Sequence, residues 1–270
     1  MIQQLEHLLA HEFDPGFEQR ARFIFEAIEE YKPKKILDAG CGRGFYSHGV
    51  AFYPFIQKIQ GFDVNDQYLA LAKTHCKDKR IKLKKANIYS LPYPDNSFDF
   101  IIFSEVLEHL TSEKRALDEL KRVLKKDGII ALTIPNEQFP FLWDPLNWLL
   151  MKLFHTHVPK DIWWLAGIWA DHERLYSPER LERVLHKNDF EVVEQKKVIH
   201  WSWPFAHLIL YGIGKNLIER LGFKMGNRFS YKKKGLAIEI LAAIMKAPST
   251  LLDSNIPLSS SVNICMLLKK

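Results

Sequence analysis

Short apolar runs alternate with amphipathic stretches through the first half of the chain. The apolar runs have the length and the Ile, Val and Phe content typical of strands, and the stretches between them have apolar residues at helical spacing. The predicted strands are 34–39, 59–63, 81–86, 98–104 and 127–135, and the predicted helices are 2–31 (with a break at Asp14-Pro15-Gly16), 45–53, 66–76 and 112–125. Such alternation predicts a doubly wound α/β fold, in which helices cover both faces of a mostly parallel sheet.

The pattern changes after Pro135. Residues 177–199 predict a helix followed by a strand, with Ser177 as N-cap and Pro178 at the first helical position. A last strand over 262–268 would bring the sheet to seven strands. We divide the chain into an N-terminal helix and α/β core (1–136), an aromatic helical cap (137–171), a helix and strand that complete the core (172–199), an apolar and basic excursion (200–257) and the last strand (258–270).

Composition separates the two halves further. All seven tryptophans lie between Trp143 and Trp203, and residues 215–234 carry seven Lys or Arg against one Glu. Outside that segment there are 31 basic and 31 acidic residues, so the formal net charge of +6 comes from one region. The three cysteines are too few and too scattered for a disulfide framework or a four-cysteine zinc site. The first residues have no secretory signal pattern, so we expect a cytoplasmic protein.

Residues 198–214 contain no Lys, Arg, Asp or Glu. Seventeen residues are the minimum for a membrane-spanning helix, and Pro204, two histidines and two glycines argue against one. Three interpretations remain: a buried cap, a homodimer surface, or an apolar hairpin at a membrane surface. In the last case the neighbouring Lys232–Lys234 would attract anionic lipid.

A glycine-rich turn follows the first predicted strand, with Gly40, Gly42 and Gly44 placed before a predicted helix. Glycine allows a tight turn and a close approach of a ligand to the backbone, and the helix start offers free N–H groups. Asp63 ends the second strand, where a carboxylate can accept hydrogen bonds from two ribose hydroxyls. These features predict a ligand that contains a nucleoside. The dinucleotide pattern G-x-G-x-x-G fails because its third glycine is replaced by Phe45, which disfavours NAD.

Five segments together resemble class I S-adenosylmethionine-dependent methyltransferases, closest to the branch of the ubiquinone, menaquinone and sterol enzymes. They are DAGCGRG (38–44), GFD (61–63), Asn87-Ile88 before LPYPDNSFD, FDFIIFSEVLEHL (98–110) and LKKDGIIALTIP (124–135). The likeness covers residues 34–135 well and 172–199 loosely. It implies a Rossmann-like sheet, S-adenosylmethionine as the cofactor and S-adenosylhomocysteine as the product.

The resemblance also implies roles for individual positions. Gly40, Gly42 and Gly44 would line the methionine half of the cofactor, and Asp38 would orient this loop and the cofactor's amino group. Asp63 would bind the ribose, with Val64 beside the adenine. Asn87 and Ile88 would flank the adenine, although the family more often has an aspartate at the first of these two positions. Ser104 would lie near the sulfonium, and Cys41 would be a small packing residue.

A base is needed only where the methyl acceptor is a hydroxyl or another protonated atom. Candidates are His109 after the fourth strand, His172 beyond the cap and, less favoured, Glu105. Structural roles compete: His109 hydrogen-bonding within its loop, and His172 anchoring the cap. The aromatic cap follows the fifth strand, at the sheet edge where open α/β sheets bind ligands, and is either plain core or an enclosure for a hydrophobic acceptor. No ligand cluster suggests a metal.

We therefore expect a methyltransferase that acts on a small, apolar or lipid-like molecule. Three alternatives are kept. An RNA methyltransferase would use Lys232–Lys234 on phosphates, but this run has few interleaved aromatics and no recognisable RNA-binding module accompanies it, so nucleic acid is a disfavoured partner. An NAD-linked oxidoreductase is disfavoured by Phe45. A non-catalytic protein that only binds the cofactor is the third.

Overall fold

The computed structural model describes residues 2–10, 12–162, 164–210, 236–252 and 260–270. A seven-stranded sheet forms its centre, with strand order β3-β2-β1-β4-β5-β7-β6. The strands are β1 (Lys35–Ala39), β2 (Lys58–Asp63), β3 (Ile81–Lys85), β4 (Phe98–Ser104), β5 (Leu124–Pro135), β6 (Glu191–Val198) and β7 (Asn263–Lys269). β1 to β5 pair in parallel, and β7 is antiparallel to both β5 and β6. The predicted doubly wound, mostly parallel sheet is confirmed.

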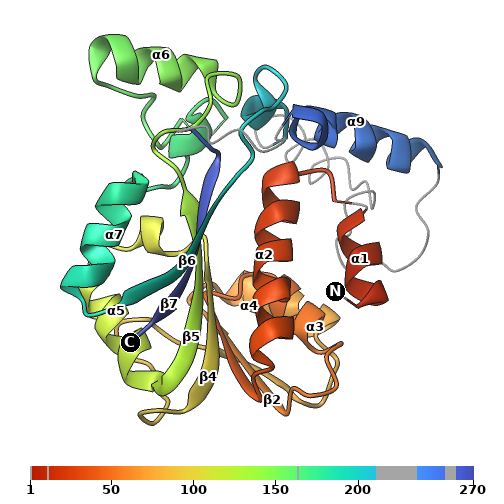
Figure 1. Ribbon diagram of the computed structural model, residues 1–270, viewed down its shortest axis with the longest axis vertical. Helices are drawn as coiled ribbons and strands as arrows, with labels where there is room; N and C mark the ends of the chain where they lie inside the picture. The colour runs from red at the N-terminus through yellow and green to blue at the C-terminus, as the bar shows by residue number, and fades with distance from the viewer. Residues whose placement is uncertain (1, 11, 163, 211–235, 253–259) are drawn as a thin grey trace.

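Helices cover both faces of the sheet (Figure 1). One face carries α1 (Gln3–Ala10), α2 (Pro15–Tyr31), α3 (Phe45–Val50) and α4 (Asp66–His75), and the other carries α5 (Glu113–Val123) and α7 (Pro178–Lys187). Neighbouring residues of a strand serve different faces: Ile36 belongs to the core with α1 to α3, and Leu37 to the core with α5 and α7. Burial on both faces explains why the central strands β4, β5 and β7 are largely apolar, whereas the edge strands β3 and β6 keep many exposed polar residues.

Capping residues set several helix boundaries as predicted. Asp14 caps α2 through a hydrogen bond from the Phe17 N–H (3.1 Å), with Pro15 at the first helical position, so the break between α1 and α2 falls where the sequence places it. Ser177 and Pro178 begin α7 in the same way. One boundary differs: α5 ends at Val123 and the chain enters β5 at once, because Leu124 pairs with Phe98 before a bulge.

The segment predicted as an aromatic cap is less helical than expected. It contains α6 (Pro145–Phe154) and a 3-10 turn (Gly167–Trp169), and the other residues described between 137 and 171 form turns and irregular backbone. Beyond β6, the 17-residue helix α9 (Leu236–Leu252) lies at the same end of the molecule as α6 (Figure 1). Among the residues described, no helix is long and apolar enough to cross a membrane.

Candidate functional site

The glycine turn lies at the carboxyl end of β1, and all three of its glycines have left-handed backbone. Their φ values are +76° at Gly40, +50° at Gly42 and +84° at Gly44. A Cβ on Gly40 would lie 2.5 Å from Val106 Cγ2, and one on Gly44 would lie 2.8 Å from Cys76 Sγ. A Cβ on Gly42 would meet no atom within 4 Å. Gly40 and Gly44 are therefore required by packing, and Gly42 faces open space that a ligand can fill.

Asp38 is buried beneath this turn and fixes the start of α3. Its Oδ2 accepts hydrogen bonds from the Ser47 backbone N–H (2.9 Å) and from the Ser47 hydroxyl (2.6 Å). Burial raises the pKa of Asp38 to about 6, against the opposing effect of the two Ser47 bonds. The side chain thus holds the start of α3, the helix that follows the glycine turn.

Asp63 connects the glycine turn to the end of β2. Its Oδ2 accepts a hydrogen bond from the Gly42 N–H and its Oδ1 one from the Asn65 N–H, both at 2.8 Å. The side chain is only partly buried, so each oxygen has a further lone pair available to a ligand hydroxyl. Val64 follows with 62% of its surface exposed, which leaves its side chain free to cover a flat ring. Asp63, Val64 and Gly42 thus form one side of the candidate site.

Asn87 and Ile88 lie after β3 and differ in their exposure. Asn87 is exposed, and its Oδ1 accepts a hydrogen bond from the Tyr89 N–H (3.0 Å). Ile88 is buried in the core shared by α5 and α7. Only the Asn87 side chain and the backbone of this turn are open to a ligand. Cys41 is a buried, free thiol whose pKa is raised by burial, as fits a packing residue.

A polar network that the sequence did not predict surrounds Ser104 at the end of β4. Ser104 Oγ lies 2.8 Å from Thr133 Oγ1 and donates to the Tyr46 hydroxyl (3.3 Å), and Thr133 donates to Glu105 Oε1 (3.0 Å). Glu105 has left-handed backbone (φ +55°) at the point where the strand ends. This hydroxyl chain joins β4 and β5 to α3, the helix that begins after the glycine turn.

The other side of Glu105 is held by two residues distant in sequence. Asn263 Nδ2 donates to Glu105 Oε2 (3.2 Å), and Arg20 Nη1 lies 3.5 Å from the same oxygen. Arg20 also donates to Asn263 Oδ1 (2.8 Å). Arg20 and Asn263 are both buried, so the Glu105 carboxylate is held by partners within the fold and is not placed as a free base.

The structure brings His109 and His172 together although 62 residues separate them. Their ring centroids are 4.7 Å apart. His109 Nδ1 donates to the Asp171 carbonyl (2.8 Å) and His172 Nδ1 to the Ile168 carbonyl (2.6 Å), which leaves each Nε2 as an acceptor. Burial, and then the proximity of His109, lowers the pKa of His172 to about 3, so His172 is neutral at physiological pH.

Glu108 is the third member of this cluster and was not predicted from the sequence. Its side chain is fully buried, with both carboxylate oxygens lacking a hydrogen-bond partner, and burial raises its pKa well above the usual range. Glu108 Oε1 lies 3.8 Å from His109 Nε2. One oxygen or nitrogen from each of the three residues lies within 4.8 Å of the others. The cluster can therefore exchange a proton or hold a divalent cation.

The aromatic residues of the cap do not form one enclosure. Phe139 and Trp143 are buried in the core, where the Trp143 ring meets His207 edge to face. Phe141, Phe154 and Trp164 are exposed, and Trp163 lies outside the described residues. In the 198–214 stretch, residues 198, 199 and 206 are buried and residues 201, 203, 205 and 209 are exposed, while 211–214 and Lys232–Lys234 also lie outside the description.

Residues 37–132 match a family model described as a methyltransferase domain. These residues include the glycine turn, Asp63 and the Ser104–His109 segment. They make up about a third of the chain. The match therefore concerns the part of the sheet that carries the candidate cofactor site and does not include the cap or α9.

Three curated relatives are similar to parts of the chain. The uncharacterized methyltransferase YcgJ of Bacillus subtilis is 32% identical over 35% of this chain and 38% of its own length. A mitochondrial ubiquinone biosynthesis O-methyltransferase of Candida albicans is 34% identical over 63% and 53%, respectively. A small RNA 2'-O-methyltransferase of Xenopus tropicalis is 28% identical over 48% and 38%. The chain thus spans between about a third and about half of the length of these relatives.

Two solved structures share the fold over most of the chain. The [4+2]-cyclase SpnF superposes with a TM-score of 0.58 at 20% identity, over 93% of this chain and 80% of the other. The YcgJ protein of Bacillus subtilis superposes with a TM-score of 0.51 at 19% identity, over 93% and 95%. At these identities the likeness is one of fold. A cyclase among such structures means that the reaction has to be argued from the site.

Proposed function

Residues 37–132 match a methyltransferase domain, and from this premise we propose that the protein is an S-adenosylmethionine-dependent methyltransferase that acts on a small, apolar or lipid-like molecule. The observation that carries the proposal is the joining of Gly42 to Asp63. The open space at Gly42 and the partly free carboxylate lie together at the carboxyl edge of the sheet, where a nucleoside and its charged tail would fit.

The sulfonium of S-adenosylmethionine supplies an activated methyl group for in-line displacement. Asp63 would hold the ribose hydroxyls, and the backbone of the glycine turn, which Asp38 orients through Ser47, would contact the methionine part. Ser104 and its hydroxyl chain would face the reacting end. The main task of the protein is alignment of donor and acceptor, which is worth on the order of 7–11 kcal/mol in favourable cases.

If the methyl acceptor is a hydroxyl, we assign His109 Nε2 as the base that takes the proton which the hydroxyl loses on methylation. The hydrogen bond to the Asp171 carbonyl fixes the tautomer that leaves this nitrogen free. His172 is too weak a base at neutral pH because its pKa is lowered to about 3, and we assign it a positioning role against the His109 ring. A proton received by His109 would favour ionisation of the neighbouring Glu108.

The apolar acceptor is supported by the position of the cap. It follows β5 at the same sheet edge as the glycine turn, and the C. albicans relative is named for ubiquinone biosynthesis. The X. tropicalis relative keeps RNA as the second candidate acceptor. NAD is disfavoured because Phe45 is buried against Phe17 and Phe25, where the third glycine of the dinucleotide pattern would stand.

The test is transfer of a labelled methyl group from S-adenosylmethionine to a total lipid extract and, separately, to total RNA. We expect label in the lipid fraction. Label in RNA alone would show that the acceptor is RNA and not a lipid-like molecule. If calorimetry shows binding of S-adenosylmethionine but neither fraction is labelled, the protein binds the cofactor without catalysing transfer. If NAD binds and S-adenosylmethionine does not, the protein is not a methyltransferase.

Two further measurements test the roles of the histidine cluster. His109→Gln should lower kcat for a hydroxyl acceptor by roughly 10²–10⁴-fold and leave the cofactor Kd unchanged. His172→Gln should have a smaller effect. A chelator should leave transfer unchanged, because the proposed mechanism uses no metal. Loss of transfer that added divalent cation restores would instead make Glu108, His109 and His172 metal ligands.

A further inference from the structure

The helix α9 exposes several large apolar side chains to solvent. Ile240, Ile244, Leu251 and Leu252 are between 50% and 73% exposed. The buried positions of the helix include two that are small or polar, Ala242 and Ser249. A surface helix of a globular domain normally buries its apolar residues and exposes its charges. Among the described side chains of α9, four large apolar ones are instead exposed together with Glu239.

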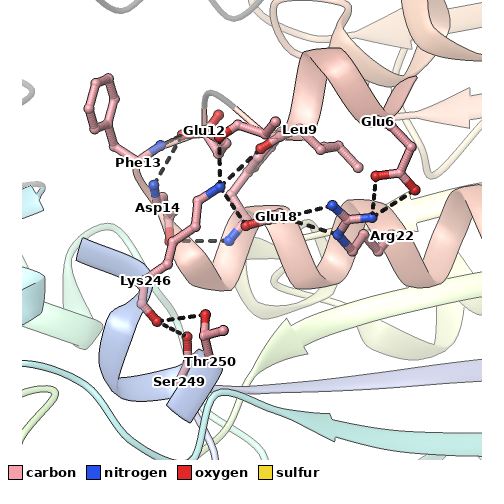
Figure 2. Close-up of polar contacts among 12 residues, drawn as sticks. Glu6, Leu9, Glu12, Phe13, Asp14, Glu18, Arg22, Lys246, Ser249 and Thr250 are labelled. Carbon is pink, nitrogen blue, oxygen red and sulfur yellow. Dashed lines mark hydrogen bonds and ion pairs between the residues drawn. The ribbon is translucent and has the colours of Figure 1, made fainter. Parts of the chain in front are cut away.

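A partly buried lysine, Lys246, holds α9 against α1 and α2 (Figure 2). Lys246 Nζ donates to the Leu9 and Ala10 carbonyls at the end of α1, both at 3.1 Å, and lies 2.8 Å from Glu18 Oε2. The side chains of Lys246 and Glu18 are 13% and 11% exposed. Because an ammonium group loses hydration when it is buried, these three acceptors are needed to keep it there. Rotation of α9 to bury its isoleucines would break all three contacts.

The exposed apolar surface continues from α9 onto the segment before it. Pro248 has no N–H to donate to the Ile244 carbonyl, and Trp203 Nε1 donates to that carbonyl instead (2.8 Å). The same segment is joined to the cap, because the Phe205 N–H donates to the Leu142 carbonyl (2.9 Å). Trp203 and Phe205 are themselves exposed.

The cap extends the same end of the molecule, where α6 and α9 both lie (Figure 1). In α6, Leu153 and Phe154 are 65% and 68% exposed, next to the exposed Lys152. We call the exposed apolar residues of these three segments the apolar rim. Its members are Leu149, Leu153 and Phe154 of α6, Trp201, Trp203, Phe205 and Ile209, and Ile240, Ile244, Leu251 and Leu252 of α9.

Charge identifies what the apolar rim would contact. The sequence that connects Ile209 to α9 carries seven Lys or Arg and one Glu between residues 215 and 234. Exposed tryptophan and phenylalanine, with the exposed Lys152 next to Leu153 and Phe154, suit the boundary between lipid headgroups and acyl chains. A second copy of the chain would bring the same positive charge against itself, whereas anionic lipid would neutralise it. With no described helix able to span a bilayer, the contact would be peripheral.

We propose that the apolar rim is the surface by which this protein binds anionic lipid bilayers. The cap begins directly after β5, at the sheet edge that carries the glycine turn, so a bound bilayer would lie next to the candidate site. The proposal concerns binding and not turnover, and it does not depend on the assigned reaction.

Flotation of the full chain with vesicles tests the proposal. We expect binding to phosphatidylcholine vesicles that contain phosphatidylglycerol, weaker binding to phosphatidylcholine alone, and a blue shift of tryptophan emission on binding. The triple variant Ile240→Ser, Ile244→Ser, Leu251→Ser should bind at least about tenfold more weakly. The matched control, Leu71→Ser with Val193→Ser, removes exposed apolar residues of α4 and β6 and should bind like the parent.

Two results would overturn the proposal. One is no flotation of the parent chain with either vesicle. The other is an equal affinity of the triple variant and the parent. Sedimentation velocity without lipid is the companion measurement: a parent dimer that the triple variant converts to a monomer would assign the apolar rim to a second copy. S-adenosylmethionine binding should be the same in all variants, so a failure of the cofactor assignment would be seen separately.

Discussion

At the scale of single residues, Asp63 both shapes and completes the candidate site. It holds the Gly42 and Asn65 N–H groups and would also accept from a ribose. Asp63→Ala should weaken binding of S-adenosylmethionine by roughly 2–4 kcal/mol, because buried hydroxyls and backbone donors lose their charged acceptor. Isothermal calorimetry measures this loss.

The neighbouring Asp66 provides the control for this change. It lies at the start of α4, is exposed and pairs with Lys85 at the surface, so Asp66→Ala should leave the cofactor affinity within about 0.5 kcal/mol of the parent. Equal losses of S-adenosylmethionine affinity in the two variants would show a general effect of negative charge. Asp63 would then not be a cofactor-binding residue.

His172 predicts a dependence of stability on pH. Its pKa is near 6.5 in the unfolded chain and about 3 in the fold, so the unfolded state binds the extra proton between these values. The stabilisation is complete above pH 6.5 and is lost as the pH falls, by up to about 1.4 kcal/mol per pH unit. The free energy of unfolding, measured with denaturant and plotted against pH, should therefore converge for the parent and His172→Gln as the pH falls below 6.5. A constant difference between them from pH 7 to pH 4 would contradict the buried, neutral imidazole.

At the scale of elements, the two glycines that follow Cys41 should respond differently to the same substitution. Gly44→Ala places a methyl group 2.8 Å from Cys76 Sγ and 3.0 Å from Ala72 Cβ, in a left-handed backbone, and should lower the free energy of unfolding by roughly 2–4 kcal/mol. Gly42→Ala meets open space and should cost only about 1–2 kcal/mol for its backbone.

Cofactor affinity should show the opposite order. The methyl group of Gly42→Ala would enter the space assigned to the ligand. This variant should therefore bind S-adenosylmethionine more weakly than Gly44→Ala does, although it is the less destabilised of the two. Thermal unfolding with and without cofactor measures both quantities. A Gly42→Ala protein that binds like the parent would place the ligand elsewhere.

The elements that the sequence predicted well are those that local chemistry determines. Apolar, β-branched runs identified most of the strands, alternation identified β3, and the Asp14-Pro15 and Ser177-Pro178 pairs identified two helix starts. The start of β5 was predicted too late because its pairing with Phe98 is a tertiary contact. The cap was predicted as more helical than it is, because aromatic residues with a helix-length spacing can also be buried by irregular backbone, as at Phe139 and Trp143.

The candidate site divides in the same way. Gly40, Gly42, Gly44 and Asp63 lie at strand ends that the pattern reveals, so their neighbourhood could be predicted. Arg20 and Asn263 are 243 residues apart, and nothing in their local sequence indicates that they share Glu105. Glu108 was missed because a glutamate in a helical turn is normally exposed, and only the packed structure shows that it is buried.

At the scale of the whole molecule, Lys246 connects the C-terminal part of the chain to α1 and α2. Lys246→Met should release α9 from this position and lower the free energy of unfolding by roughly 1–3 kcal/mol, because the Glu18 carboxylate and two carbonyls lose a donor. Hydrogen exchange should show faster amide exchange in α9 than in the sheet. Lys152→Met in α6, an exposed lysine, is the control, and an identical exchange pattern in both variants would contradict the anchoring role.

The place of β7 in the sheet has a consequence for biosynthesis. This strand lies between β5 and β6, and it supplies Asn263 to the buried Arg20–Glu105 group. A nascent chain on the ribosome can make β1 to β5 early, yet β6 has no neighbour until residues 263–269 have been translated and have left the exit tunnel. Until then Arg20 and Glu105 lack the amide that links them, so this buried group is complete only after β7 has paired with β5 and β6.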